Sequence, residues 1–255
     1  MDAWADLRLQ IEWGADEALD DLPIDRLVAP LPRVVAAASA SPVKPQPRPV
    51  PAAPLAPARR ASDSAAACNT LDELRQALTT FDGCSLSATA TNLVFGDGNP
   101  SCGLMLVGEG PGAEEDRAGL PFVGASGQFL DRMLASIGLD RSSFYITNLI
   151  PWRPPGNRNP TEAEVAVCLP FLLRHIALVR PKLLVLLGNL SVQSVTQSKT
   201  GITRARGKWQ DVEIEGMGRV RALPMLHPAY LLRNHGAKRE AWADMMTLRR
   251  ALDQR

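Results

Sequence analysis

Cysteine is scarce in this chain, and long apolar runs are missing. The 255 residues hold four cysteines, with no C-x-x-C pair among them, which argues against a disulfide framework. No apolar stretch approaches the roughly 20 residues that a membrane span needs. The first residues carry acids early and lack the basic-then-apolar pattern of a secretion signal. We therefore expect a soluble, cytoplasmic protein that does not bind a membrane.

Neither sign of charge dominates, because the formal net charge is +1. The distribution is uneven, however. Residues 1–26 hold eight acids against two arginines, so the rest of the chain is mildly basic. An acidic head and a basic body permit a nucleic-acid partner without requiring one.

Proline and alanine divide the chain into parts. Nine of the 21 prolines lie between residues 29 and 67, in a stretch that cannot build a core. We therefore predict an amphipathic acidic helix over 1–27, a flexible linker over 28–68 and a globular domain over 69–255. The helix could dock a protein partner or fold back on the basic face.

The domain alternates short apolar runs with helical patterns. The runs are "GLMLVG", "SFYITNLI", "KLLVLLG" and "VRALPMLHP". This alternation predicts an α/β fold with a central four-stranded, mainly parallel sheet covered by helices on both faces. In such sheets ligands bind beyond the carboxyl ends of the strands. The unusual loops "GEGPG", "NLIPWRPPGNRNPT", "GNLS" and "HPAYLLRN" all begin there.

Two of the candidate site residues follow the first strand. Glu109 stands between Gly108 and Gly110, and glycines let another molecule approach the main chain. The alternative is a tight turn with a solvated carboxylate. Phe122, in the loop stretch "LPFVG", is either a lid over the core or a platform on which a planar ring stacks.

Other candidates end the second and fourth strands. Asn148 is either a turn former or a side chain that offers a donor and an acceptor together. His227 faces the same mouth as Glu109 and Asn148. Of the other histidines, His175 lies among helical leucines, where a structural role is expected, and His235 lies in a polar loop.

Three separated stretches together resemble the family 4 uracil-DNA glycosylases. They are "GEGPGAEEDRAGLPFVGASGQFLDRML", "ITNLIPWRPPGNRNPTEAE" and "LHPAYLLRN", supported by "LVFGDGNP" and "GITRARGKW". The resemblance runs from about residue 72 to residue 252. It implies a three-layer α/β/α sandwich that flips uracil out of DNA and hydrolyses its N-glycosidic bond. It also implies a monofunctional, metal-independent enzyme that acts as a monomer on single- or double-stranded DNA.

The resemblance gives each site residue a role. Phe122 would stack on the flipped base, and Gly108 and Gly110 on either side of Glu109 would let the nucleotide approach closely. The NH2 of Asn148 would meet uracil O4, and its carbonyl would accept from N3–H, a pattern that cytosine reverses. His227 would face O2, where negative charge builds. Glu109 would orient or activate water and stabilise the positive sugar.

The resemblance also suggests two further kinds of DNA contact. One is with the base stack and the other is with the phosphate backbone. One residue after His227 would fill the gap left by the base, and the candidates are Leu231, Leu232 and Arg233. Basic residues in two loops would bind phosphates, with solvated surface charge as the alternative. They are Arg153, Arg158, Arg204, Arg206 and Lys208.

The chain departs from this family at one expected cofactor. Many members carry an iron–sulfur cluster on four cysteines, and only Cys84 and Cys168 match those positions. Phe81 and Trp152 stand at the other two. We therefore expect no cluster, no metal and no other cofactor, with the two aromatics filling the space. The loop "PPGNRNPT" also lacks the histidine with which a related group traps abasic sites covalently.

Two other functions compete with this one. The first is a non-catalytic module of the same fold that binds damaged or single-stranded DNA, and it would be indicated by loss of Glu109, Asn148 or His227. The second is a metal-dependent nucleotide hydrolase that uses the acidic run Glu114, Glu115 and Asp116. Substrate breadth and the exclusion of thymine are open at this point.

Overall fold

A six-stranded sheet forms the centre of the computed structural model, which describes residues 55–254. The strand order is β1-β3-β2-β4-β6-β5. The strands are β1 (Asp97–Gly98), β2 (Leu104–Gly108), β3 (Tyr145–Asn148), β4 (Leu183–Leu187), β5 (Gln210–Ile214) and β6 (Gly218–Met225). The four predicted strands are the central ones, and they pair in parallel. The edge strands β1 and β5, which the sequence did not predict, pair antiparallel.

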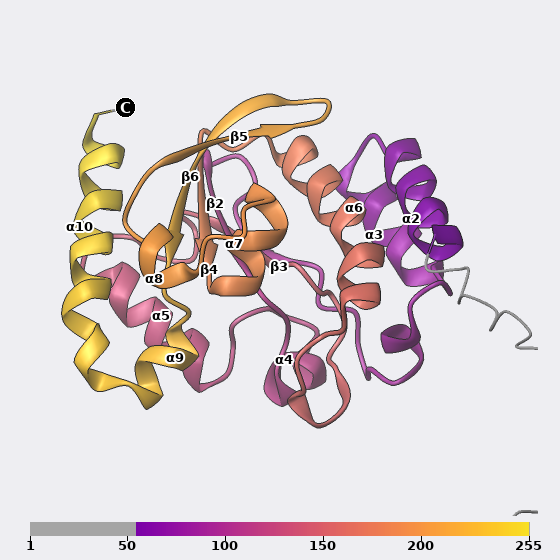
Figure 1. The fold of residues 1–255 in the computed structure, drawn as a ribbon, viewed down its shortest axis with the longest axis horizontal. Coiled ribbons are helices and arrows are strands. Elements are labelled where there is room, and N and C mark those ends of the chain that lie inside the picture. Colours follow the sequence, from indigo (N-terminus) through magenta and orange to yellow (C-terminus); the bar gives the residue numbers. More distant parts are fainter. Residues whose placement is uncertain (1–54, 255) are drawn as a thin grey trace, which may run out of the picture. The chain divides into compact units, whose positions relative to one another are not determined.

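Helices cover both faces of the sheet, so the predicted three layers are present (Figure 1). On β2, Met105 and Val107 join a core shared with α6 (Glu162–Val179), α3 (Leu71–Thr80) and α7 (Asn189–Thr196). Leu104 and Leu106 join the opposite core, which α5 (Ala125–Ala135) and α10 (Lys238–Asp253) complete. Both faces of the central strands are therefore buried, which explains their unbroken apolar sequences.

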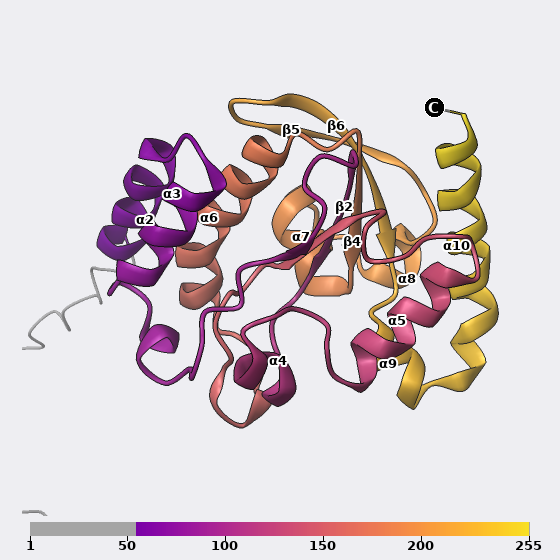
Figure 2. The same ribbon diagram turned by 180° about the vertical axis from the view of Figure 1, so that it is seen from behind.

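The linker prediction over 28–68 is wrong for its last part, because Leu55–Ala67 forms the helix α2. This helix packs against α6, on the side away from the sheet (Figure 2). Its buried residues Ala61 and Ala65 are small, which lets the two helices approach closely. Pro57 stands in the first turn, where proline is tolerated, and the following alanine-rich stretch favours a helix. The predicted helix over 1–27 lies outside the described residues.

Helix α6 begins with a complete capping motif and contains a proline. Thr161 caps it, and Glu164 completes a capping box. Pro170 lies inside the helix, which is assigned without a break from Glu162 to Val179. The helix is packed on two sides. One side contacts α2 and α3, and the other side faces the sheet.

Short helices fill the loops that follow the strands. They are α4 (Ala113–Ala118), α8 (Ile202–Ala205), α9 (Pro228–Arg233) and the 3₁₀ turns η1 (Ser85–Ala88), η2 (Pro155–Asn157) and η3 (His235–Ala237). Because β2, β3, β4 and β6 are parallel, the loops after them meet at one edge of the sheet. Within residues 55–254, no helix is long and apolar enough to cross a membrane.

Candidate active site

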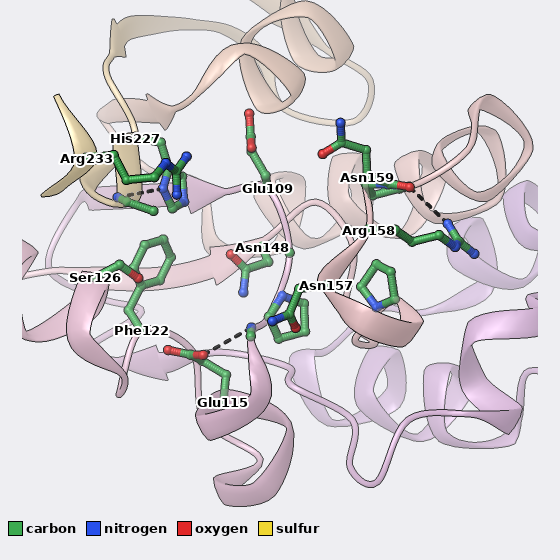
Figure 3. A pocket seen from close by; sticks show the side chains of 16 residues that line it. Glu109, Glu115, Phe122, Ser126, Asn148, Asn157, Arg158, Asn159, His227 and Arg233 are labelled. Atoms are coloured by element: carbon green, nitrogen blue, oxygen red, sulfur yellow. Dashed lines mark hydrogen bonds between the residues drawn. The ribbon is translucent and has the colours of Figure 1, made fainter. Parts of the chain in front are cut away.

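A cavity of about 300 Å³ opens where the central strands end (Figure 3). Phe122 and His227 lie on one side, Glu109 and Asn148 in the middle, and the loop 153–160 on the other side. The remaining lining residues are Gly110, Pro111, Gly112, Glu115, Ser126, Ala229 and Arg233. The four residues to which the sequence assigned the chemistry therefore line one cavity.

Glu109 is fixed by the start of helix α7. Its Oε1 accepts a hydrogen bond from the Leu190 N–H at 2.8 Å. Gly188 makes this approach possible, because a Cβ there would lie 2.5 Å from Oε1, and its φ of 98° favours glycine. Burial raises the pKa of Glu109, and the N–H groups of Leu190 and Asn189 offset part of that rise. The result is a positioned carboxylate that is more basic than one in water.

Asn148 ends β3 with an unsatisfied polar atom. The residue is 5% exposed, and among the described residues its Oδ1 is the buried side-chain atom without a hydrogen-bond partner. Buried polar atoms are nearly always paired, so an unpaired one that faces a cavity indicates a ligand. Gly108 leaves room for it, since a Cβ there would lie 2.4 Å from Oδ1 and 2.5 Å from the Phe122 ring.

Phe122 has a backbone conformation that few residues adopt. Its φ is 56°, and such strain persists only where the surroundings enforce it. Arg141 donates a hydrogen bond to the Phe122 carbonyl, and Asp131 holds Arg141 at 2.8 Å. A Cβ at Gly127 would lie 1.8 Å from the same carbonyl oxygen. The loop therefore presents the Phe122 ring to the cavity, stacked 5.7 Å from the His227 ring.

His227 caps helix α9. Its Nδ1 accepts from the Ala229 N–H at 3.1 Å, so the neutral ring carries its proton on Nε2. Burial lowers the pKa of His227 to about 4, and the positive charge of Arg233 contributes in the same direction. The ring is therefore a neutral hydrogen-bond donor at physiological pH.

The acidic run holds the site loops together. Glu115 accepts from the Gly124 N–H at 2.8 Å and from the Gly112 N–H at 3.1 Å, which joins the loops on either side of α4. Asp116 accepts from the Thr91 N–H at 2.8 Å. The sequence had left these acids as possible metal ligands. In the part of the chain that the structure describes, no group of three or more such side chains could hold a metal ion.

A second cavity of about 350 Å³ shares Glu109, His227 and Arg233 with the first. Its lining also includes residues that the sequence did not predict as part of the site, among them Gly188, Thr203 and Tyr230. Tyr230 is 40% exposed, and an exposed aromatic residue close after the strand-terminal His227 was a signal that could have found it. Glu109 therefore lines both cavities.

The three wedge candidates differ in exposure. Leu231 is fully buried against Leu226 and Ala241, and its role as the wedge stays a prediction. The turn of α9 directs it into the core. Leu232 is half-buried and Arg233 is exposed, so both stay predictions.

Two predicted phosphate contacts are engaged in ion pairs. Arg206 is 17% exposed at its side chain and binds Asp244 at 2.7 Å, and its contact with phosphate stays a prediction. Arg158 binds Glu164 at 2.6 Å. Arg153 is half-buried and donates to Asn157 at 2.7 Å. Arg204 and Lys208 are exposed and stay predictions.

The positions expected for cluster ligands form a packed core. Cys84 and Cys168 are buried, and a hydrogen bond between their side chains lowers the pKa of Cys84 to about 7. The Phe81 ring packs edge-on against Phe171, with centroids 5.1 Å apart. Trp152 is 4% exposed within the same core. Two thiols in contact and two aromatic rings do not fit a group that needs four thiolates.

Comparison with known proteins agrees with this geometry. Residues 95–246 match the family model of the uracil DNA glycosylase superfamily. The chain is 42% identical to a type-4 uracil-DNA glycosylase of Archaeoglobus fulgidus over 64% of this chain and 83% of that protein. A type-4 uracil-DNA glycosylase of Thermotoga maritima is also 42% identical, over 59% of this chain and 77% of its own length. One from Sulfurisphaera tokodaii is 37% identical over 71% and 84%.

The resemblance that the motifs indicated is thus confirmed by matches that span the site and most of each relative. The chain belongs to the uracil DNA glycosylase superfamily.

Proposed function

We propose that this protein removes uracil from DNA by hydrolysing the bond between the base and its deoxyribose. The unpaired Oδ1 of Asn148 carries the proposal. Uracil offers an N–H at N3 beside a carbonyl at C4, and an asparagine amide matches that pair with one acceptor and one donor. Cytosine offers the reverse, so a buried amide fixed in this orientation rejects it by roughly 10⁴-fold.

The residues around Asn148 supply the rest of the chemistry. A flipped base rests against the Phe122 ring, which stacks with His227. As the C1′–N1 bond breaks, its electron pair leaves with uracil, and His227 donates its Nε2–H toward O2 where the charge gathers. Glu109 accepts a proton from water while the water oxygen bonds to C1′. That proton then passes to the departing base or to solvent.

Both titratable residues have protonation states suited to these roles. His227, with a pKa of about 4, is neutral and donates without carrying a charge. Glu109 has a raised pKa, which makes its carboxylate a better base near neutral pH. The neighbouring N–H groups of α7 keep the ionised form accessible.

We also propose that the reaction needs neither a metal nor an iron–sulfur cluster. The support is the packing of Trp152 and Phe81 at two of the four ligand positions. The loop 153–160 contains no histidine, which supports a monofunctional reaction that ends with a free abasic site. The substrate is DNA, in single or double strands, bound by one copy of the chain inside the cell.

Base release tests the proposal. The protein is incubated with chelator on single- and double-stranded oligonucleotides that carry one deoxyuridine, beside thymidine controls. We expect alkali-labile sites at uracil alone, and a rate reduced about 10²–10⁴-fold in Glu109→Gln. The matched control is Glu162→Gln, an exposed glutamate outside both cavities, which should be as active as the wild type.

Other outcomes would change the proposal. Binding to these oligonucleotides without release would instead support the non-catalytic DNA-binding module. Release that survives Glu109→Gln at full rate would keep the function and remove Glu109 from its role. Release that requires an added metal ion would contradict the mechanism.

A further inference from the structure

One wall of the base cavity is a loop that contains the 3₁₀ turn η2. Residues 153–160 connect β3 to α6, and five of them line the cavity: Pro154, Asn157, Arg158, Asn159 and Pro160. Figure 3 shows Asn157, Arg158 and Asn159 opposite Phe122 and His227. Gly156 and Asn157 have φ of 64° and 55°. An exposed loop of this kind keeps one shape only if its ends are held.

The amino-terminal end of this loop is held by the protein core. Trp152 is buried in the same apolar core as Cys84 and Cys168. The carbonyl of the preceding Pro151 accepts from the Val94 N–H at 2.9 Å. The loop therefore leaves the core at Arg153, directly before its cavity-lining residues.

The carboxyl-terminal end is held by one ion pair with two parallel hydrogen bonds. Arg158 donates from Nη1 and Nη2 to the two carboxylate oxygens of Glu164, at 2.8 and 2.6 Å. Arg158 Nη1 also donates to the Asn159 carbonyl at 3.0 Å. Glu164 in turn accepts from the Thr161 N–H at 2.7 Å. The loop is thereby joined to the first turn of α6.

Glu164 and Arg158 differ in solvent exposure, and this difference determines the cost of losing one partner. The Glu164 side chain is 8% exposed and the Arg158 side chain 43% exposed. Arg158 is the largest influence that lowers the pKa of Glu164, to about 2. Loss of Arg158 would therefore leave a buried carboxylate without its counter-charge, and such a loss costs more than breaking a surface pair.

We infer that Arg158 and Glu164 are positioning residues that fix the wall formed by residues 153–160 against the bound base. The inference rests on the proposed function, and it assigns to Arg158 a role other than the phosphate contact that the sequence suggested. A guanidinium that already binds a buried carboxylate at two points is held in one orientation. Trp152 holds the amino-terminal end of the loop and the Arg158–Glu164 pair holds its carboxyl-terminal end. We call these contacts the anchor, and they use protein side chains alone.

Three substitutions test the anchor. Glu164→Gln keeps the size and the capping group but removes the charge, Arg158→Lys keeps the charge but not the two-point contact, and Arg158→Ala removes both. Glu162→Gln, in the same turn of α6, is the matched control. Circular dichroism and thermal unfolding select conditions under which each variant is folded.

The first readout is amide hydrogen exchange of residues 153–160 in the free protein, which does not depend on catalysis. We expect Glu164→Gln and Arg158→Ala to speed exchange about tenfold or more in this loop, with Arg158→Lys between them and the wild type. Exchange equal to that of the wild type in both would overturn the anchor, whether or not the protein releases uracil.

The second readout is steady-state uracil release at two salt concentrations. We expect kcat to fall about tenfold or more in Glu164→Gln and in Arg158→Ala, with the salt dependence of KM unchanged. The double variant should be no slower than either single variant, because the two residues act as a unit.

A phosphate contact would give the opposite pattern. Arg158→Ala would then raise KM and weaken its salt dependence, and Glu164→Gln would lower KM by freeing the arginine. That result, or altered exchange with unchanged kcat, would overturn the inference. A wild-type protein without activity would refute the proposed function, while the exchange measurement would still decide the anchor.

Discussion

The base cavity and the cysteine-containing core between α6 and the 81–84 segment differ in what their polar groups contact. In the cavity, Asn148 keeps an unpaired oxygen, and Glu109 and His227 each use one atom for anchoring and line open space. In the core, Cys84 and Cys168 contact each other, and Trp152 is buried beside them.

This difference separates residues that bind a ligand from residues that pack. Where a side chain is held rigidly and one polar atom is left unsatisfied, the fold bears a cost that only a ligand offsets. Where aromatic rings stand at ligand positions, burial of apolar surface stabilises the fold without any cofactor. The predictions below change one region or the other.

The largest effect is expected at Asn148. Asn148→Asp replaces the donor with a second acceptor, which would face uracil O4, so uracil release should fall by roughly 10⁴-fold. Single-turnover release from a deoxyuridine oligonucleotide measures this loss. Asn234→Asp, an exposed position outside both cavities, is the control, and a loss of less than tenfold at Asn148 would contradict its proposed role.

The core should respond in stability rather than in specificity. Trp152→Ala removes a buried indole, and we expect a loss of about 3–5 kcal/mol in the free energy of unfolding. Trp242→Ala, which removes an indole that is 49% exposed, should cost much less. Chemical denaturation measures both values. Equal, small losses would mean that Trp152 does not contribute to the core as described.

The pH dependence of catalysis should follow Glu109 and not His227. Because burial raises the pKa of Glu109, protonation should reduce kcat/KM about tenfold per pH unit below that pKa, starting at a higher pH than for an ordinary carboxylate. The pKa of His227 is about 4, so no break is expected near pH 6.5. A profile from pH 4.5 to 8.5 tests this, and a break near 6.5 that His227→Asn removes would contradict it.

The smallest effect is expected from the two thiols. Cys84→Ala combined with Cys168→Ala should leave kcat within about twofold of the wild type, because neither side chain lines the base cavity and residues distant from the reacting atoms act only through positioning. Cys102→Ala, outside this core, is the control. A large loss of uracil release from a folded double variant would show that the cysteines serve the reaction.

The sequence predicted the parts of the site that depend on strand order. Apolar runs identify buried parallel strands, and parallel strands end at one edge, so Glu109, Asn148 and His227 had to lie close together. The motifs also placed Phe122, although its φ of 56° and the Arg141 contact that enforces it were not visible in the sequence.

The sequence did not show contacts between residues that lie far apart in the chain. Arg206 pairs with Asp244, 38 residues later in the chain, and no local pattern signals that pair. Leu231 is buried because of the way α9 packs. The helix α2 was missed because its packing against α6 outweighs the proline-rich sequence that precedes it.

The iron content of the active protein tests the central claim most directly, which is that the base cavity works beside a core that holds no cofactor. The protein is purified without oxygen, and iron and acid-labile sulfide are measured on the same sample as the rate of uracil release. We predict full activity at far less than one iron per chain, with no change after a strong chelator. Stoichiometric iron and sulfide, with activity that falls as iron is removed, would contradict the account.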